Sequence, residues 1–235
     1  MLGYMIRTPV VLLIFCSLTA CAVSPTGGAG SDSASTNAPT QAQAIREVLS
    51  QSADVAVNRL GRMDGYWANP QVRIPLPEEL QRMEKTLRRY GFERYTRELA
   101  ESLNRAAEAA VPAAKAVLLA AIRDMPLSDE ANIVRGADDA ATLYFRTHTD
   151  EALRARLKPI VADATARANV TGAYKRLMKK ATFLEKASGP GRPDLDAHVT
   201  RAALDGLYLL MAEEEQRIRR HPQARATDLL KKVFR

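Results

Sequence analysis

The sequence predicts an all-α protein: a single compact domain of about eight to ten helices behind an N-terminal leader and a tether. From about residue 42 to the end, apolar residues recur at the three- and four-residue spacing of helices. Prolines, glycines and capping residues divide this stretch into helix-sized pieces. The best strand candidate, residues 72–74, is too short to build a sheet. The hydrophobic content of 46% is ordinary for a globular protein and argues against a disordered chain.

The first twenty residues have the pattern of a secretory signal peptide. Arg7 is their only charge, and an apolar run of about twelve residues follows it and ends at Ala20. That run is too short to cross about 30 Å of hydrocarbon as a helix. We therefore expect residues 1–20 to be a leader that is removed on export.

The residues LTAC at positions 18–21 resemble the lipobox of bacterial lipoproteins. The resemblance implies that Cys21 becomes the new N-terminus and carries the acyl chains that anchor the protein in a membrane. Ala22 follows, where an aspartate would resemble an inner-membrane retention signal, so the implied location is the periplasmic face of the outer membrane. The alternative is a plain secretory signal with a chance cysteine. Because Cys16 leaves with the leader, no cysteine remains as a nucleophile or metal ligand.

Residues 21–41 separate the lipidated cysteine from the domain. They are mainly Gly, Ser, Thr, Pro and Ala, with one charge at Asp32. Such a composition cannot bury a core, so we expect a flexible tether. The remaining residues, 42–235, suffice for one domain that buries roughly 70% of its unfolded surface without a disulfide.

The first three helices have clear boundaries. The first ends at Gly61, which fits a helix stop. The second begins at Pro77, which suits a first turn and precedes two acids at the positive end of the helix dipole, and it ends at Gly91. The third begins near Phe92, and Pro112 is expected to kink or restart it.

The middle of the domain contains two N-cap patterns, at residues 128–130 and 149–151, and each predicts a helix start. A further helix is expected over residues 174–184. Gly and Pro at residues 187–193 then predict a loop.

Asp194 is predicted to open the most apolar helix. Its middle, residues 202–212, is apolar almost all round, so we expect this helix to be central and buried. Pro222 ends it, and a short last helix carries apolar residues between positions 229 and 234.

Four stretches carry recognisable motifs: DGYWANP leading to IPLP over residues 64–77, LNRAAE over 103–108, GADDAAT leading to YF over 136–145, and LDGL, AEEE and TDLLKKVF over 204–234. Together they resemble the DUF4197 family of bacterial, mainly proteobacterial, lipoproteins. The resemblance covers nearly the whole domain and implies an all-helical exported domain of unknown function. It supplies no activity and no catalytic residues.

Enzymatic chemistry has little support in the sequence. There is no Gly-x-Ser-x-Gly elbow and no phosphate loop, and His148, His198 and His221 lack the spacings of metal ligands. We therefore expect no catalytic residue, no metal and no cofactor.

Asp138 and Asp139 are the most suggestive acids, since a carboxylate pair can bind a cation or act in acid–base catalysis. The alternative is that Asp138 caps the helix after Gly136, while Asp139 lies in its first turn.

Tyr66, Trp67 and Asn69 lie in a long irregular segment that holds the only tryptophan. Loops of this kind sometimes line binding sites, which makes this segment the first choice for a ligand or partner surface. The alternative is that the aromatic rings pin the loop onto the helices.

The end of the chain is rich in charge. Glu213 and Glu215 precede arginines by four residues, a helical ion-pair spacing that predicts a solvated, paired face at 213–215. Residues 217–235 carry seven Lys and Arg against one Asp, which accounts for six of the net charge of +7. Lys231 and Lys232 are therefore candidates to meet anionic lipid, lipopolysaccharide or an acidic protein. The alternative is the usual enrichment of cations at helix C-termini.

These features predict a non-enzymatic, lipid-anchored domain that binds a protein or another envelope component in the periplasm. The alternative is a carrier or sensor of a small apolar or lipid ligand held between helices. An enzyme with an unrecognised acid-pair site is the third possibility. Nucleic acid is not expected as a partner, because an exported lipoprotein does not routinely meet it. The sequence does not fix the oligomeric state.

Overall fold

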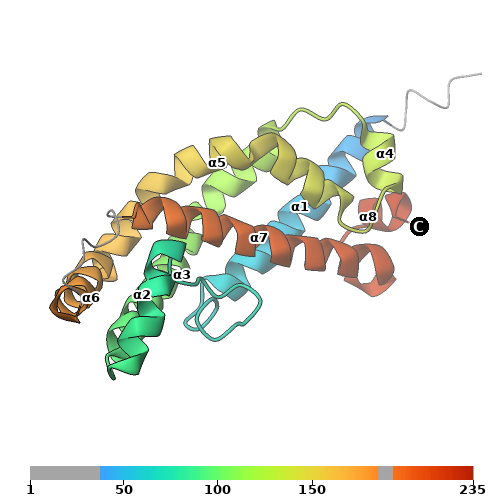
Figure 1. Cartoon of the computed structure of the whole chain (residues 1–235). Coiled ribbons are helices and arrows are strands. Elements are labelled where there is room, and N and C mark those ends of the chain that lie inside the picture. Colours follow the sequence, from blue (N-terminus) through green and yellow to red (C-terminus); the bar gives the residue numbers. More distant parts are fainter. Residues whose placement is uncertain (1–37, 185–192, 235) are drawn as a thin grey trace, which may run out of the picture. The chain divides into compact units, whose positions relative to one another are not determined.

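The structure is a computed structural model that describes residues 38–184 and 193–234. The predicted leader, Cys21, most of the tether and most of the predicted loop at 187–193 lie outside the described residues. The described residues form eight α-helices and one 3₁₀ turn and contain no strand, which confirms the all-α prediction (Figure 1). The elements are α1 (Ala38–Leu60), α2 (Glu78–Arg89), α3 (Glu93–Asp124), α4 (Glu130–Arg135), α5 (Ala140–Arg167), α6 (Val170–Leu184), α7 (Leu195–Arg220), the turn η1 (Pro222–Ala224) and α8 (Asp228–Val233).

The four longest helices, α1, α3, α5 and α7, all contact one another and form the core. The central position predicted for α7 is therefore confirmed. Helices α2 and α6 both pack on α3 at one end of the domain, whereas α4 and α8 pack on α1 at the other end (Figure 1). The described chain begins at the end that carries α4 and α8.

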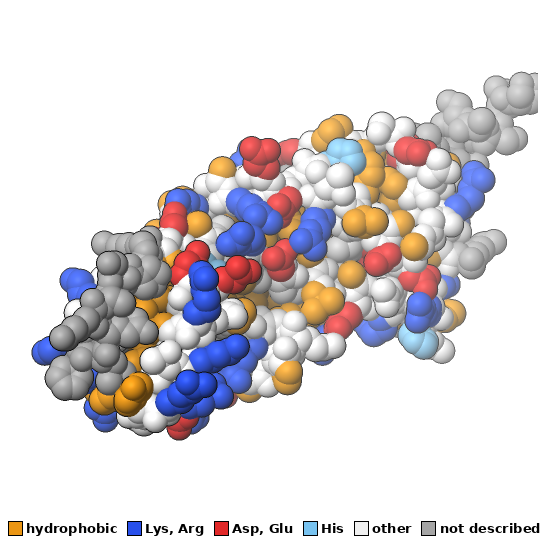
Figure 2. All heavy atoms as spheres, in the orientation of Figure 1, with side chains coloured by type: hydrophobic (Ala, Val, Ile, Leu, Met, Phe, Trp, Pro, Cys, Tyr) orange, Lys and Arg blue, Asp and Glu red, His pale blue; other side chains and the backbone are white. Residues whose placement is uncertain are grey.

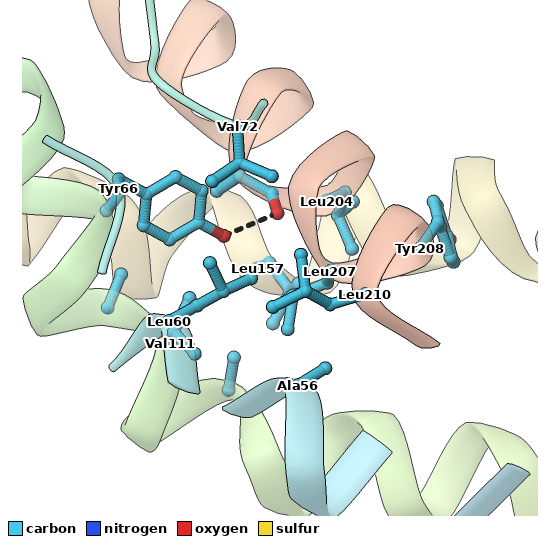
Figure 3. Packing of buried hydrophobic residues seen from close by; sticks show 14 of the residues in the cluster. Ala56, Leu60, Tyr66, Val72, Val111, Leu157, Leu204, Leu207, Tyr208 and Leu210 are labelled. Carbon is cyan, nitrogen blue, oxygen red and sulfur yellow. Dashed lines mark hydrogen bonds between the residues drawn. The ribbon is translucent and has the colours of Figure 1, made fainter. Parts of the chain in front are cut away.

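The core is built from leucines that α7 directs at its neighbours. Figure 3 shows Leu204, Leu207 and Leu210 of α7 beside Leu60 of α1 and Leu157 of α5. All five side chains are buried. Since each such side chain stabilises the fold by about 1.5–3 kcal/mol, the apolar middle of α7 accounts for its central place.

One predicted helix start is wrong. The N-cap pattern at residues 149–151 lies inside α5, where the Thr149 hydroxyl donates to the Phe145 carbonyl at 2.7 Å. Threonine makes this bond to the carbonyl four residues earlier when it stands within a helix. The buried stripe of Phe145, Leu153 and Leu157 runs across the pattern, so packing on the core keeps the helix continuous.

Two other boundaries differ from expectation. Pro112 does not restart a helix, because α3 continues through it as a single element. Its ring lies against the end of α1, where a Cβ on Gly61 would stand 2.7 Å from the proline Cγ. Gly61 thus leaves room for this packing. Helix α1 begins at Ala38, four residues before the expected start of the domain at residue 42.

Candidate functional site

The segment between α1 and α2, residues 61–77, is held on α3 by buried polar side chains; we call it the Trp67 loop. The buried Glu108 carboxylate accepts the backbone N–H groups of Tyr66 at 3.1 Å and of Trp67 at 3.0 Å. Arg105 donates to Glu108 at 2.7 Å and to Asp64 at 2.8 Å, which neutralises the buried carboxylate. The loop is therefore fixed by charge-assisted bonds, which are stronger than neutral hydrogen bonds.

A second contact with α3 fixes the far part of the loop. The Asn104 side-chain oxygen accepts the Ile74 N–H at 2.9 Å, and its amide nitrogen donates to the Ile74 carbonyl at 2.9 Å. A buried amide thus satisfies both backbone groups of a residue that has no strand partner. The extended stretch predicted at residues 72–74 is stabilised in this way and not by a sheet.

Tyr66 pins the loop onto α7. Its hydroxyl donates to the Ala203 carbonyl at 2.8 Å, and its ring lies against α7 (Figure 3). A Cβ on Gly206 would stand 2.8 Å from the Tyr66 ring and 3.3 Å from Val72 Cβ, so glycine is needed for this close approach. Burial raises the pKa of Tyr66 above its usual range, so the phenol stays neutral. Tyr66 is a structural residue.

The other two loop candidates are more accessible. The Trp67 ring is half-buried, and the exposed Arg73 guanidinium lies 3.7 Å from its centre, close enough for a cation–π interaction. The Asn69 side-chain oxygen accepts the backbone N–H of Gln71 at 3.1 Å and so shapes the turn. Of the three predicted loop residues, Trp67 is the one whose side chain offers a surface to a ligand.

A groove of about 460 Å³ lies between the Trp67 loop, the start of α5 and α7. We call it the Asp139 groove. Its lining includes Arg73 and Val72 of the loop, Asp139, Thr142, Leu143 and Arg146 of the α5 region, and Asp205, Gly206, Tyr208 and Leu209 of α7.

The walls of the Asp139 groove combine apolar and polar side chains. Leu143 and Leu209 are 61% and 39% exposed and line the same groove, so they present apolar surface to it. Arg146 and Asp205 form an ion pair at 2.6 Å. The Thr142 hydroxyl is buried and makes no hydrogen bond within the described part of the chain. The groove therefore offers apolar contact at Leu143 and Leu209 together with the charged side chains of Asp139 and Arg73.

The predicted acid pair is divided between two roles. Asp138 accepts a bond from Arg220 at 2.6 Å, whereas Asp139 lines the groove and has no ion-pair partner among the described residues. The expectation that Asp138 caps a helix is wrong, because α5 follows Asp139 and neither carboxylate bonds its first N–H groups. In residues 38–184 and 193–234, no cluster of three or more His, Cys, Asp or Glu is placed to hold a metal ion.

Glu215 of α7 caps α5 from a distance. Its carboxylate accepts the N–H of Ala141 at 2.9 Å and of Thr142 at 2.7 Å, and it pairs with Arg219 at 2.8 Å. The Glu215 and Arg219 side chains are 0% and 7% exposed. The solvated face predicted for residues 213–215 is therefore wrong at Glu215, and also at Glu214, which is buried and takes the Arg217 ion pair expected for Glu213.

The partners of Arg219 explain why this ion pair is buried. Arg219 donates to the carbonyls of Val134 at 2.8 Å and Ile133 at 3.1 Å, and its guanidinium lies 4.6 Å from the centre of the Phe234 ring. Buried charges need such a full set of partners. The pair joins α7 to α4, α5 and the C-terminal residues.

Most of the C-terminal cations also have structural partners. Arg217 bonds the buried Glu214, and Lys231 pairs with Asp228 at 3.0 Å. Arg225 donates to the carbonyls of Ile218 and Arg219 near the end of α7. Lys232 is exposed and has no ion-pair partner among the described residues. Of the two candidate lysines, Lys232 alone is therefore without an ion-pair partner among the described residues.

Sequence reasoning missed the residues that hold the site: Asn104, Glu108, Gly206 and Glu215. All four lie in the motifs over residues 103–108 and 204–234. These motifs are recognisable in the sequence, but they do not indicate what the four residues do. The partners through which these residues hold the site are 30 residues away for Asn104 and Ile74 and up to 140 residues away for Gly206 and Tyr66, so local spacing could not reveal them.

The fold and its grooves define the class of protein: an all-helical domain with open surface grooves. No described helix combines the length and apolar character that crossing a membrane requires. The family model described as "Protein of unknown function (DUF4197)" matches residues 35–235. The chain belongs to the DUF4197 family. Neither the curated proteins nor the solved structures contained a match to this chain.

Proposed function

We propose that this protein is a non-enzymatic binding module of the cell envelope, and that the Asp139 groove takes a short peptide segment of another envelope protein. The observation that supports this most directly is the groove itself. Leu143 and Leu209, together with the charged side chains of Asp139 and Arg73, line a groove whose walls include the Trp67 loop, and the loop is fixed by its bonds to Glu108 and Asn104. Preorganised walls lower the entropy cost of binding.

The chemistry of the groove favours binding over catalysis. The charges of Arg146 and Asp205 satisfy each other, and burial raises the pKa of the Tyr208 phenol above its usual range. Tyr208 is therefore protonated at neutral pH and is a poor general base. Asp139 remains as a single carboxylate, and no histidine or cysteine is among the described residues that line the groove.

The charges at the rim favour a peptide over a purely apolar ligand. Asp139 and Arg73 belong to different walls, and neither has an ion-pair partner among the described residues. A peptide that places an apolar side chain between Leu143 and Leu209 can offer a cation to Asp139 and a carboxylate to Arg73. The groove's volume also lies within the range of small-molecule sites, so the test must separate these ligands.

Site-specific photo-crosslinking in intact cells tests this proposal. Leu143→p-benzoylphenylalanine in the full chain should yield an adduct with a second polypeptide. Arg156→p-benzoylphenylalanine, at an exposed position of the same helix, should yield none. An adduct of lipid or small-molecule mass would support the carrier alternative instead. Equal adducts at the two positions would show that the groove is not the site.

The proposed location rests on the lipobox-like residues at 18–21. We infer that Cys21 carries acyl chains and anchors the tethered domain on the periplasmic face of the outer membrane. Cys21→Ser should abolish labelling by radioactive palmitate and leave only weak, salt-sensitive membrane association, because surface contacts do not replace several acyl chains. Palmitate incorporated into the Cys21→Ser variant would contradict the lipobox.

A further inference from the structure

The two ends of the domain differ in how many of their cations are uncompensated. Residues 217–234 have an excess of five cations over acids. Three acids from outside that stretch, Glu214, Glu215 and Asp138, bind three of them. The local excess at the C-terminal end is therefore about two, much smaller than the sequence suggests.

The opposite end carries the larger excess. Residues 78–98, which span α2 and the start of α3, contain six Lys and Arg against five Glu, and α6 contains four Lys and Arg and no acid. The combined excess is five. Both α2 and α6 pack on α3, so these charges belong to one end of the domain, which we call the cationic end. Figure 2 shows Lys and Arg gathered over α2 at this end.

Contacts on both sides of α3 show that cations from different elements lie close to this helix. On one side, a groove of about 720 Å³ between the Trp67 loop, α2 and α3 is lined by four cations and two acids, Arg73, Lys85, Arg88 and Arg97 with Glu84 and Glu93. On the other side, Arg94 and Lys180 lie 4.6 and 5.7 Å from the centre of the Tyr95 ring. The hydrogen bond from Arg94, together with these two charges, lowers the pKa of Tyr95, as expected in a positive potential.

The cationic end also presents an aromatic residue. Tyr90 is 62% exposed at the turn between α2 and α3, where Gly91 adopts a φ of 72° and reverses the chain. A ring with an apolar body and a polar tip suits the boundary between lipid chains and water. Lys85 and Arg89 lie one turn apart on α2, are exposed, and form no ion pair within the described residues.

We propose that the cationic end docks on an anionic phospholipid surface, with headgroup phosphates bound by the cations of α2, α3 and α6, and with Tyr90 at the interface. Charge complementarity selects the anionic surface, and the exposed aromatic ring selects a lipid bilayer over a purely polar polyanion. The proposal depends neither on the Asp139 groove nor on acylation of Cys21.

Vesicle sedimentation with the full chain tests the docking. Every sample carries Cys21→Ser so that no acyl chain contributes, and binding to phosphatidylcholine vesicles is the baseline. Vesicles of phosphatidylglycerol and phosphatidylcholine should bind the chain above this baseline, and added salt should weaken the binding. Equal binding to both kinds of vesicle would overturn the proposal.

A matched pair of double variants locates the surface. Lys85→Gln with Arg89→Gln should weaken binding to the anionic vesicles about 30-fold, because each cation near such a surface contributes roughly a fivefold factor. Lys231→Gln with Lys232→Gln changes the net charge equally and should change binding less than threefold. All four residues are exposed, so unchanged circular dichroism is expected for both variants. Equal losses, or a larger loss in the C-terminal pair, would overturn the assignment.

A competition experiment separates lipid from other polyanions. Inorganic polyphosphate or single-stranded DNA, at the same phosphate concentration as the vesicles, should displace only a minor fraction of the chain. Tyr90→Ser should weaken vesicle binding and leave any binding to the soluble polyanions unchanged. Complete displacement by either polyanion, together with no effect of Tyr90→Ser, would show that lipid is not the partner.

Discussion

Glu215→Ala should be among the most destabilising single substitutions in this domain. The Glu215 carboxylate is fully buried, accepts the first two N–H groups of α5, and is the only acid paired with Arg219 among the described residues. Its removal leaves the Arg219 guanidinium, which is 7% exposed, without a compensating charge. The same change uncaps a helix of 28 residues.

The expected loss can be estimated from these contacts. Breaking a buried ion pair by removing one partner costs about 3–5 kcal/mol. Removing a side chain that caps a helix typically costs about 1 kcal/mol. For a domain of this size, a loss of 3–5 kcal/mol lowers the melting temperature by roughly 6–20 °C. Urea unfolding followed by circular dichroism measures the free energy directly.

Glu213→Ala is the matched control, because Glu213 is only partly buried and has no ion-pair partner among the described residues. It should change stability by no more than about 0.5 kcal/mol. Glu215→Leu combined with Arg219→Met should be less destabilising than Glu215→Leu alone, since no unpaired charge is then buried. If Glu215→Ala and Glu213→Ala unfold at the same urea concentration, the buried-pair argument is refuted.

Three further predictions concern the Trp67 loop and its contacts. Gly206→Ala should cost about 1–3 kcal/mol in urea unfolding, because the added methyl meets the Tyr66 ring at 2.8 Å, and an unchanged midpoint would contradict that contact. Glu108→Ala should shift the fluorescence of Trp67 to longer wavelength, because the loop loses the carboxylate that holds two of its N–H groups; an unshifted spectrum would mean that other contacts suffice. The contribution of Tyr66 and Tyr208 to stability should be constant below about pH 10 and fall above it, because burial raises the pKa of both phenols and only the unfolded chain then loses these protons. Tyr66→Phe should make this alkaline loss shallower, and an identical pH profile would exclude Tyr66 as a cause.

The helices themselves could be predicted well from the sequence, because their ends are marked by local chemistry. Asp194 caps α7 as expected, with its carboxylate accepting the Ala197 N–H at 2.9 Å. Gly91 and Pro222 stand at helix ends as predicted. The pattern at residues 149–151 misled the prediction because capping residues also occur inside helices, where packing decides the outcome.

The site was harder to predict, because its chemistry depends on contacts between distant segments. Tyr66 and Trp67 were correctly placed in a long loop, but Glu108, which fixes the loop, follows Trp67 by 41 residues. The spacing of Glu215 and Arg219 suggested a surface pair. The carbonyls and N–H groups that bind this buried pair come from residues 133–142, which lie 73 to 86 residues earlier in the chain.

Helix α1 lies against α7 and α8, so the first described helix completes its packing only with the last ones. During synthesis, the ribosome releases α1 long before α7 exists, and the nascent chain cannot complete its core until α7 and α8 have emerged. The apolar faces that α1 packs against α7 and α8 therefore stay uncovered while the chain is being made. A stop codon anywhere before residue 219 should therefore leave a product that is degraded, not a shortened functional domain.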